Sequence, residues 1–192
     1  MQGVPSINLV SVGALDVLSE TLKASEATHV VRSLTEARRV LDAYGERPPG
    51  AAVHVDLLGH STRDHRLLRL GGTVVDALDP LVRRFFEEVG RSGVLQAMNA
   101  ASLRLLGCET AVSPSGMRTL RMLANLLGLP VVGSSKRLSR THYTERGFDP
   151  RFGAVLVAAA PWVRRSQAAF VPLPVGMGVP LRGAGAREGI PR

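Results

Sequence analysis

Two segments of the chain each join a run of apolar residues to a glycine and then to a side chain that can do chemistry. His60 follows the run 53–58, and Cys108 follows the run 102–106. A cysteine thiol becomes a strong nucleophile when a neighbouring imidazole favours the thiolate, and the same imidazole can then protonate a departing amine. The pattern predicts an acyl-transfer site in which Cys108 is the nucleophile and His60 the general acid and base.

The spacing of these residues predicts how the two runs pair. If both runs are parallel neighbouring strands and His60 lies beside Cys108, then Asp56 lies beside Arg104, because the two pairs are the same number of residues apart. Side chains alternate between the faces of a sheet, so all four would share one face. A charge inside a buried strand costs free energy unless it is paired. We therefore predict an Asp56–Arg104 pair in this register.

The two segments together resemble the CHAT domains, a group related to caspases, gingipains and separases. The shared pattern is a hydrophobic strand ending in histidine, then a second strand ending in a Cys-Glu-Thr run, here at 105–111. Gly116, the leucine-rich stretch after it and the Val-Val-Gly-Ser segment at 131–134 also fit the pattern. The resemblance covers roughly residues 50–135.

This resemblance implies a fold, an activity and a partner. The fold is a three-layer, caspase-like α/β fold with a mostly parallel central sheet flanked by helices. The activity is that of a cysteine endopeptidase on a protein or peptide substrate, with no metal or organic cofactor. CHAT domains usually work in regulated proteolytic or defence systems, so a bacterial system of this kind and a separate activating or regulatory protein are expected.

Two positions depart from the CHAT pattern. Ser61 follows the histidine where a glycine N–H usually helps to bind the oxyanion, and Ala111 replaces another glycine. We expect the main-chain N–H groups of Ser61 and Cys108 to donate to the oxyanion. Glycine permits a closer approach to the backbone than serine does, so the alternative is a catalytically inactive caspase-like scaffold or protein-interaction module.

A basic segment after the expected strand at 131–132 is the candidate for substrate binding. In the caspase-like group, segments that follow the cysteine-bearing strand and the next strand partly line the pocket beside the nucleophile. The cations here are Lys136, Arg137 and Arg140. They would favour an acidic side chain at the cleavage position. A solvated basic loop is an equal alternative, and Asp149 or Glu145 would instead select a basic side chain.

The remaining histidines and Glu109 have separate interpretations. His65 and His142 lie in polar segments and are alternative bases. His29 and His54 lie in apolar runs, which is typical of core or interface histidines that hydrogen-bond to a neighbour. Glu109 is expected to orient its loop or to cap the helix that follows.

The elements that must position these residues follow an alternating pattern of strands and helices, which favours a parallel sheet with crossover helices. Strands are expected at 7–12, 29–31, 51–58, 103–106, 131–132 and 154–159, with a further short strand within 67–72. Five helices are expected. The first carries leucines 15, 18 and 22, and the second begins after the capping pair Ser33 and Glu36. The others are expected from Asp79 to 89, at 94–100, and from Ser113 to Gly128.

Composition excludes several classes of protein. The chain has 192 residues, 45% of them hydrophobic, which suits one domain at 1–171 and a Gly/Pro/Arg-rich tail at 172–192. A single cysteine excludes an internal disulfide framework and a zinc site built on cysteines. No apolar run is long enough to span a bilayer and no secretory signal is visible, so we expect a cytoplasmic protein without a membrane partner.

The net charge of +8 raises the question of nucleic-acid binding. Residues 1–135 hold 14 basic and 13 acidic side chains, whereas residues 136–192 hold 10 basic and 3 acidic ones. Only 4% of the chain is aromatic, so there is little surface on which bases could stack. The distribution favours a solvated basic tail over a nucleic-acid partner.

Overall fold

The computed structural model describes residues 4–16 and 27–162. The predicted tail at 172–192, the last residues of the predicted domain at 163–171, and leucines 18 and 22 of the first predicted helix therefore lie outside the described residues.

The centre of the described unit is a six-stranded sheet with the order β10-β7-β6-β3-β1-β2. Its strands are β1 (Ser6–Ser11), β2 (Thr28–Val31), β3 (Val53–Leu58), β6 (Ala100–Leu106), β7 (Val131–Ser134) and β10 (Leu156–Ala159). Every pairing is parallel except that of β10 with β7. The predicted α/β class with a mostly parallel central sheet is confirmed.

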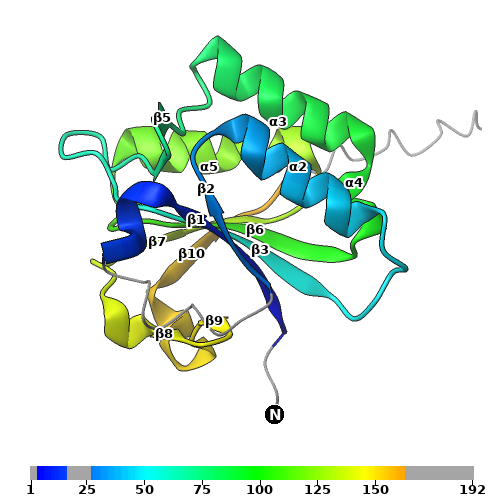
Figure 1. Cartoon of the computed structure of the whole chain (residues 1–192). Coiled ribbons are helices and arrows are strands. Elements are labelled where there is room, and N and C mark those ends of the chain that lie inside the picture. The colour runs from blue at the N-terminus through cyan, green and yellow to red at the C-terminus, as the bar shows by residue number, and fades with distance from the viewer. Residues whose placement is uncertain (1–3, 17–26, 163–192) are drawn as a thin grey trace, which may run out of the picture. The chain divides into compact units, whose positions relative to one another are not determined.

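The helices α2 (Leu34–Gly45), α3 (Pro80–Ser92), α4 (Val94–Ala97) and α5 (Pro114–Leu127) lie over one face of the sheet (Figure 1). Side-chain caps set where they begin. Ser33 accepts a hydrogen bond from the Glu36 N–H, Asp79 caps α3, and Ser113 accepts from the Gly116 N–H. The Glu36 carboxylate accepts from the Arg32 N–H rather than from the Ser33 N–H, so only half of the predicted capping box forms.

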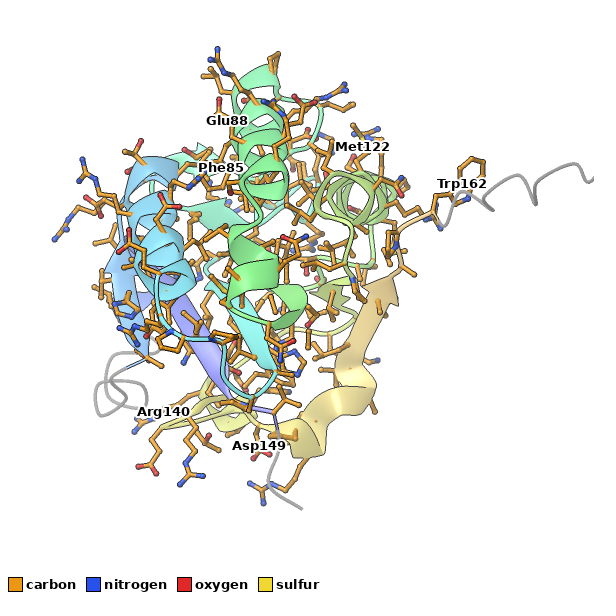
Figure 2. The ribbon with its side chains drawn as sticks, turned by 90° about the vertical axis from the view of Figure 1, so that its right-hand side faces the viewer. Phe85, Glu88, Met122, Arg140, Asp149 and Trp162 are labelled. Atoms are coloured by element: carbon orange, nitrogen blue, oxygen red, sulfur yellow. The ribbon has the colours of Figure 1, made fainter. Side chains whose placement is uncertain are left out.

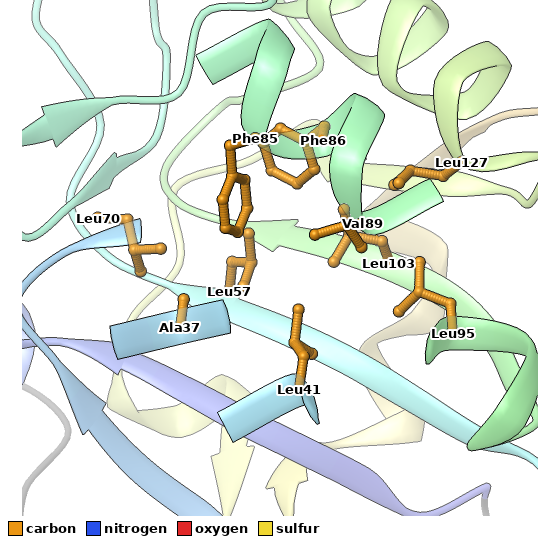
Figure 3. A pocket seen from close by; sticks show the side chains of 10 residues that line it. All are labelled: Ala37, Leu41, Leu57, Leu70, Phe85, Phe86, Val89, Leu95, Leu103 and Leu127. Carbon is orange, nitrogen blue, oxygen red and sulfur yellow. The ribbon is translucent and has the colours of Figure 1, made fainter. Parts of the chain in front are cut away.

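The helix-covered face of the sheet carries the apolar core. Alternate strand residues such as Leu9, Val55 and Leu105 point to this side and are at most 2% exposed. A gap between the sheet, α2 and α3 has a volume of only about 10 Å³ and is lined by ten apolar side chains (Figure 3). This gap has room for no more than about one water molecule, so it is not a ligand site.

The other face of the sheet is covered, among the described residues, by short segments that the sequence pattern did not predict. These are η2 (Arg140–His142), β8 (Tyr143–Thr144), β9 (Gly147–Phe148) and η3 (Pro150–Val155) (Figure 1). In Figure 2, Arg140 and Asp149 lie on this side, away from Phe85 and Glu88 of α3. Each segment is too short to show a hydrophobic period.

Several boundaries differ from the predictions: β3 begins at Val53 and β10 at Leu156, β6 begins earlier at Ala100, and β7 runs on to Ser134. The predicted helix 94–100 ends at Ala97, because Asn99 takes a left-handed conformation (φ 55°) and β6 begins at the next residue. The short strand predicted within 67–72 is β4 (Arg69–Leu70), and it pairs with an unpredicted β5 (Thr73–Val74). After β1, the chain turns at once into η1 (Val12–Ala14).

Within the described ranges, no helix combines the length and apolar character needed to cross a membrane.

Candidate active site at the carboxyl ends of β3 and β6

The strands β3 and β6 are adjacent and parallel in the predicted register. Asp56 lies opposite Arg104, and Leu58 lies opposite Leu106. Beyond the last pair, the Gly59 N–H still donates to the Leu106 carbonyl at 3.4 Å. The next residues, His60 and Cys108, therefore leave the sheet at the same edge, where open parallel sheets form their binding sites.

His60 and Cys108 line one pocket with a volume of about 70 Å³. The other lining residues are Ala14, Gly59, Leu106, Gly107, Leu138, Ser139 and Tyr143. The Cys108 residue is partly buried, whereas the His60 side chain is 51% exposed. The structure thus brings together the two residues that the sequence singled out.

The thiol and the imidazole have separate partners. Cys108 Sγ donates to the Leu138 carbonyl oxygen at 3.6 Å, and His60 Nε2 lies 3.7 Å from Oδ1 of Asp16. Over residues 4–16 and 27–162, no hydrogen bond joins His60 to Cys108. Asp16 was missed by sequence reasoning, although its place just after β1, the other neighbour of β3, was a usable signal.

Close packing explains the glycine before each reactive residue. A Cβ atom on Gly59 would collide with the Arg69 carbonyl oxygen. A Cβ atom on Gly107 would lie 2.5 Å from Ser61 Oγ and 2.9 Å from Leu68 Cδ1. The two glycines therefore let the histidine-bearing and cysteine-bearing turns pack directly against their neighbours.

The predicted oxyanion donors lie in this packed region. The pairing of Ser61 with Leu68 is flanked by hydrogen bonds from Thr62 N–H to the Leu67 carbonyl and from Arg69 N–H to the His60 carbonyl. The Ser61 N–H therefore points away from the segment that carries Leu68. Its Oγ is buried and has no hydrogen-bond partner among the described residues.

The predicted substrate-binding segment runs beside the cysteine. The Glu109 N–H donates to the Lys136 carbonyl at 3.0 Å, and the Ala111 N–H donates to the Ser134 carbonyl at 2.8 Å. Leu138 and Ser139 line the Cys108 pocket. The side chains of Lys136, Arg137 and Arg140 are exposed and do not line it.

Tyr143 is a pocket residue that the sequence did not indicate. It is 8% exposed and lies edge-to-face with Phe148 at a ring separation of 5.9 Å. Burial, and after it the nearby charges of Asp56 and Cys108, raise the pKa of Tyr143, so the phenol stays neutral. The loop before Tyr143 is polar and irregular, so no sequence pattern indicated this residue.

The histidines predicted to be structural have the partners that such a role requires. His54 Nδ1 lies 2.8 Å from Ser102 Oγ, and His29 Nε2 lies 3.0 Å from the Tyr44 hydroxyl. Burial, with Arg104 adding to it, lowers the pKa of His54, and burial together with Arg47 lowers that of His29.

The two alternative bases, His65 and His142, do not line the Cys108 pocket. His65 lines a wide groove of about 820 Å³ formed by the loop after His60, the β4–β5 hairpin and the start of α3. His60 lines this groove as well as the smaller pocket. His142 accepts a hydrogen bond from the Ser139 N–H at 3.1 Å and packs on Phe152.

The acidic alternatives for substrate selection also lie outside the pocket. The Asp149 carboxylate binds Arg151, with Nη2 2.6 Å from Oδ2, and these hydrogen bonds hold the pKa of Asp149 below its usual range. Glu145 is exposed. In the described part of the chain, no group of three His, Cys, Asp or Glu side chains is gathered as a metal site.

No protein-family model matches the chain, and no curated protein matches it significantly in sequence.

Proposed function

We propose that this chain is a cysteine endopeptidase of the CHAT/caspase-like type, with Cys108 as the nucleophile and His60 as the general acid and base. The observation that carries the proposal is that both side chains line one pocket, each just beyond the end of one of two adjacent parallel strands. The resemblance to CHAT domains at 55–61 and 105–111 supports it, and the mostly parallel sheet agrees with the fold that the resemblance implies.

The reaction needs only groups that these turns carry. The Cys108 thiol gives its proton to the His60 imidazole, and Sγ attacks the carbonyl carbon of the peptide bond. The N–H groups of Ser61 and Cys108 stabilise the resulting oxyanion. The imidazolium then protonates the departing amine, which leaves a thioester on Cys108. Water, deprotonated by His60, hydrolyses the thioester and restores the thiol.

For catalysis, the Cys108 thiol and the His60 imidazole must each leave the group that they contact in the structure. The thiol must leave the Leu138 carbonyl, and the imidazole must turn from Asp16 toward Sγ. Catalytic hydrogen bonds are often loose without substrate and tighten when it binds. A separate activating or regulatory protein acts in this proposal on the segment that carries Leu138.

The substrate is a protein or peptide with an acidic residue at the cleavage position. The exposed cations Lys136, Arg137 and Arg140 lie on the segment whose backbone pairs with the cysteine-bearing turn. The groove beside His60 offers about 820 Å³ for a peptide chain leading to the pocket. No cofactor enters this chemistry.

The test is labelling with a peptide that carries an acidic residue followed by a thiol-reactive ketone, read by mass spectrometry. The wild-type chain should form an adduct on Cys108, Cys108→Ala should form none, and His60→Ala should react far more slowly. Arg84→Gln is the control, because Arg84 is exposed on α3 and lines neither the groove nor the Cys108 pocket. Equal labelling of wild type and His60→Ala would contradict the proposed dyad.

The second candidate is the catalytically inactive scaffold, and two observations favour it. The thiol donates to a carbonyl rather than to His60, and Ser61 replaces the glycine of the CHAT pattern with a side chain that fills space next to Gly107. A scaffold would show an accessible Cys108 that reacts with iodoacetamide at the same rate with and without His60. A peptidase would lose reactivity when His60 is removed.

A further inference from the structure

Two residues close to the proposed dyad have a backbone conformation that their residue types rarely adopt. Arg66, in the turn after His60, has a φ of 54°, and Glu109, directly after Cys108, has a φ of 60°. The third non-glycine residue with positive φ among the described residues is Asn99, a type that tolerates this conformation. Strained backbone of this kind persists only where surrounding contacts hold it, and it is concentrated at functional sites.

The two strained residues are bound to each other. Arg66 Nε lies 3.3 Å from Oε2 of Glu109, and the two side chains are 36% and 26% exposed. The pair is therefore partly shielded from solvent, unlike the surface pair Arg84–Glu88, whose side chains are 77% and 47% exposed. Partial shielding strengthens the attraction between opposite charges.

Each partner belongs to a turn that is closed by its own hydrogen bonds. In the histidine turn, Thr62 N–H donates to the Leu67 carbonyl at 2.8 Å, and Thr62 Oγ1 accepts from the Leu67 N–H at 3.1 Å. In the cysteine turn, the Val112 N–H donates to the Glu109 carbonyl at 3.0 Å. These hydrogen bonds restrict the shape of each turn, so a link between the turns limits how far they can separate.

A second contact joins the same two turns. Ser113 Oγ donates to the His65 carbonyl at 2.5 Å, one residue before Arg66 and one after Val112. This contact fixes the far ends of the turns, whereas the ion pair acts next to Cys108. The charged pair is the link that directly adjoins a reacting residue.

We propose that Arg66 and Glu109 are a positioning pair that sets the separation of the His60 imidazole and the Cys108 thiol. The proposal rests on the peptidase function proposed above. It requires no contact between the pair and the substrate. Proton transfer and attack depend steeply on the separation of the reacting atoms, so releasing the pair should slow chemistry at Cys108.

The experiment measures the rate of Cys108 alkylation by iodoacetamide across the pH range, in the full chain. Arg66→Gln and Glu109→Gln remove one charge each and keep most of the side-chain length. We expect each to lower the rate at neutral pH roughly tenfold and to move the pH profile toward that of a free thiol. The double variant should react no more slowly than either single one, and the reversed pair Arg66→Glu with Glu109→Arg should recover most of the rate.

Controls separate this proposal from the proposed function. Arg83→Gln breaks an exposed pair on α3 and should leave the profile unchanged. If His60→Ala alters the profile but Arg66→Gln and Glu109→Gln do not, the positioning pair is wrong and the dyad stands. If His60→Ala also leaves the profile unchanged, both proposals fail. Single effects that multiply in the double variant would show two independent residues and overturn the pair. Thermal unfolding of each variant checks that it is folded. If Glu109→Gln does not fold, the test rests on Arg66→Gln.

Discussion

The guanidinium of Arg104 donates two hydrogen bonds to the carboxylate of Asp56, with Nε 2.5 Å from Oδ1 and Nη2 2.6 Å from Oδ2. The two residues are 6% and 0% exposed, and Nη2 also donates to Ser6 Oγ at 2.8 Å. The ring of Phe148 lies 5.6 Å from the guanidinium. A buried pair of this kind tolerates one register of β3 on β6, and that register carries His60 and Cys108 to the same pocket.

Breaking this pair should be severely destabilising. Asp56→Asn leaves the Arg104 charge buried without its carboxylate, and we expect a loss of about 3–5 kcal/mol in the free energy of unfolding. Urea denaturation measures it. Arg84→Gln, which breaks an exposed pair on α3, should cost less than about 1 kcal/mol. Asp56→Leu combined with Arg104→Met should lose less than Asp56→Asn alone, and an equal or larger loss would contradict this account.

Stability should fall below about pH 6.5 in part because of His54. Its pKa in the folded chain is lowered, so the unfolded chain binds the proton more tightly and gains population as the pH falls. His29 contributes in the same direction. His54→Gln should therefore lose less unfolding free energy than wild type between about pH 8 and pH 5.5.

The matched control for this pH effect is His65→Gln, since His65 is exposed. It should keep the wild-type dependence on pH. An unchanged slope in His54→Gln would show that burial of His54 does not govern acid sensitivity.

Gly107→Ala should destabilise the site through packing. The new methyl group would lie 2.5 Å from Ser61 Oγ, and overpacking of this kind costs about 1–3 kcal/mol. Adding Ser61→Gly should recover part of the loss, because it removes the closest atom. Gly72→Ala meets nothing within 4 Å and is the control. Thermal unfolding gives the comparison, and full stability of Gly107→Ala would refute the packing argument.

Tyr143 should contribute through its ring more than through its hydroxyl. Burial and the contact with Phe148 both involve the ring, which Tyr143→Phe keeps, so this variant should change the unfolding free energy by less than about 1 kcal/mol. Tyr143→Ala removes the edge-to-face contact with Phe148 and should cost about 3–5 kcal/mol. Urea denaturation of both variants tests this, and a large loss in Tyr143→Phe would point to a bond that the hydroxyl makes.

Substrate choice should depend on the basic segment. If the chain cleaves after acidic residues, Arg137→Gln with Arg140→Gln should lower kcat/KM for an acidic peptide roughly tenfold and leave a neutral peptide nearly unchanged. The kinetic comparison of two such peptides measures the effect. An equal decrease for both peptides would mean that these cations do not recognise the acidic side chain at the cleavage position.

From the sequence alone one could predict the strands of a mostly parallel sheet, the register of β3 on β6 and the placement of His60 and Cys108 at one edge. Each long apolar run is visible locally. The register could be predicted although its partners are distant in the chain, because Asp56 and Arg104 have the same separation as His60 and Cys108 and strands alternate their side chains with a period of two. The caps of α2, α3 and α5 were also readable, since a cap involves residues only a few positions apart.

Only the tertiary structure decided what surrounds the pair. The approach of Asp16 to His60, of Leu138 to Cys108 and of Tyr143 to the pocket joins segments that are distant in the chain. The β8–β9 hairpin is too short to show a period, and the left-handed turns at Arg66 and Glu109 contradict the preferences of those residue types. Such features are fixed by packing against the rest of the fold, so no local sequence pattern predicts them.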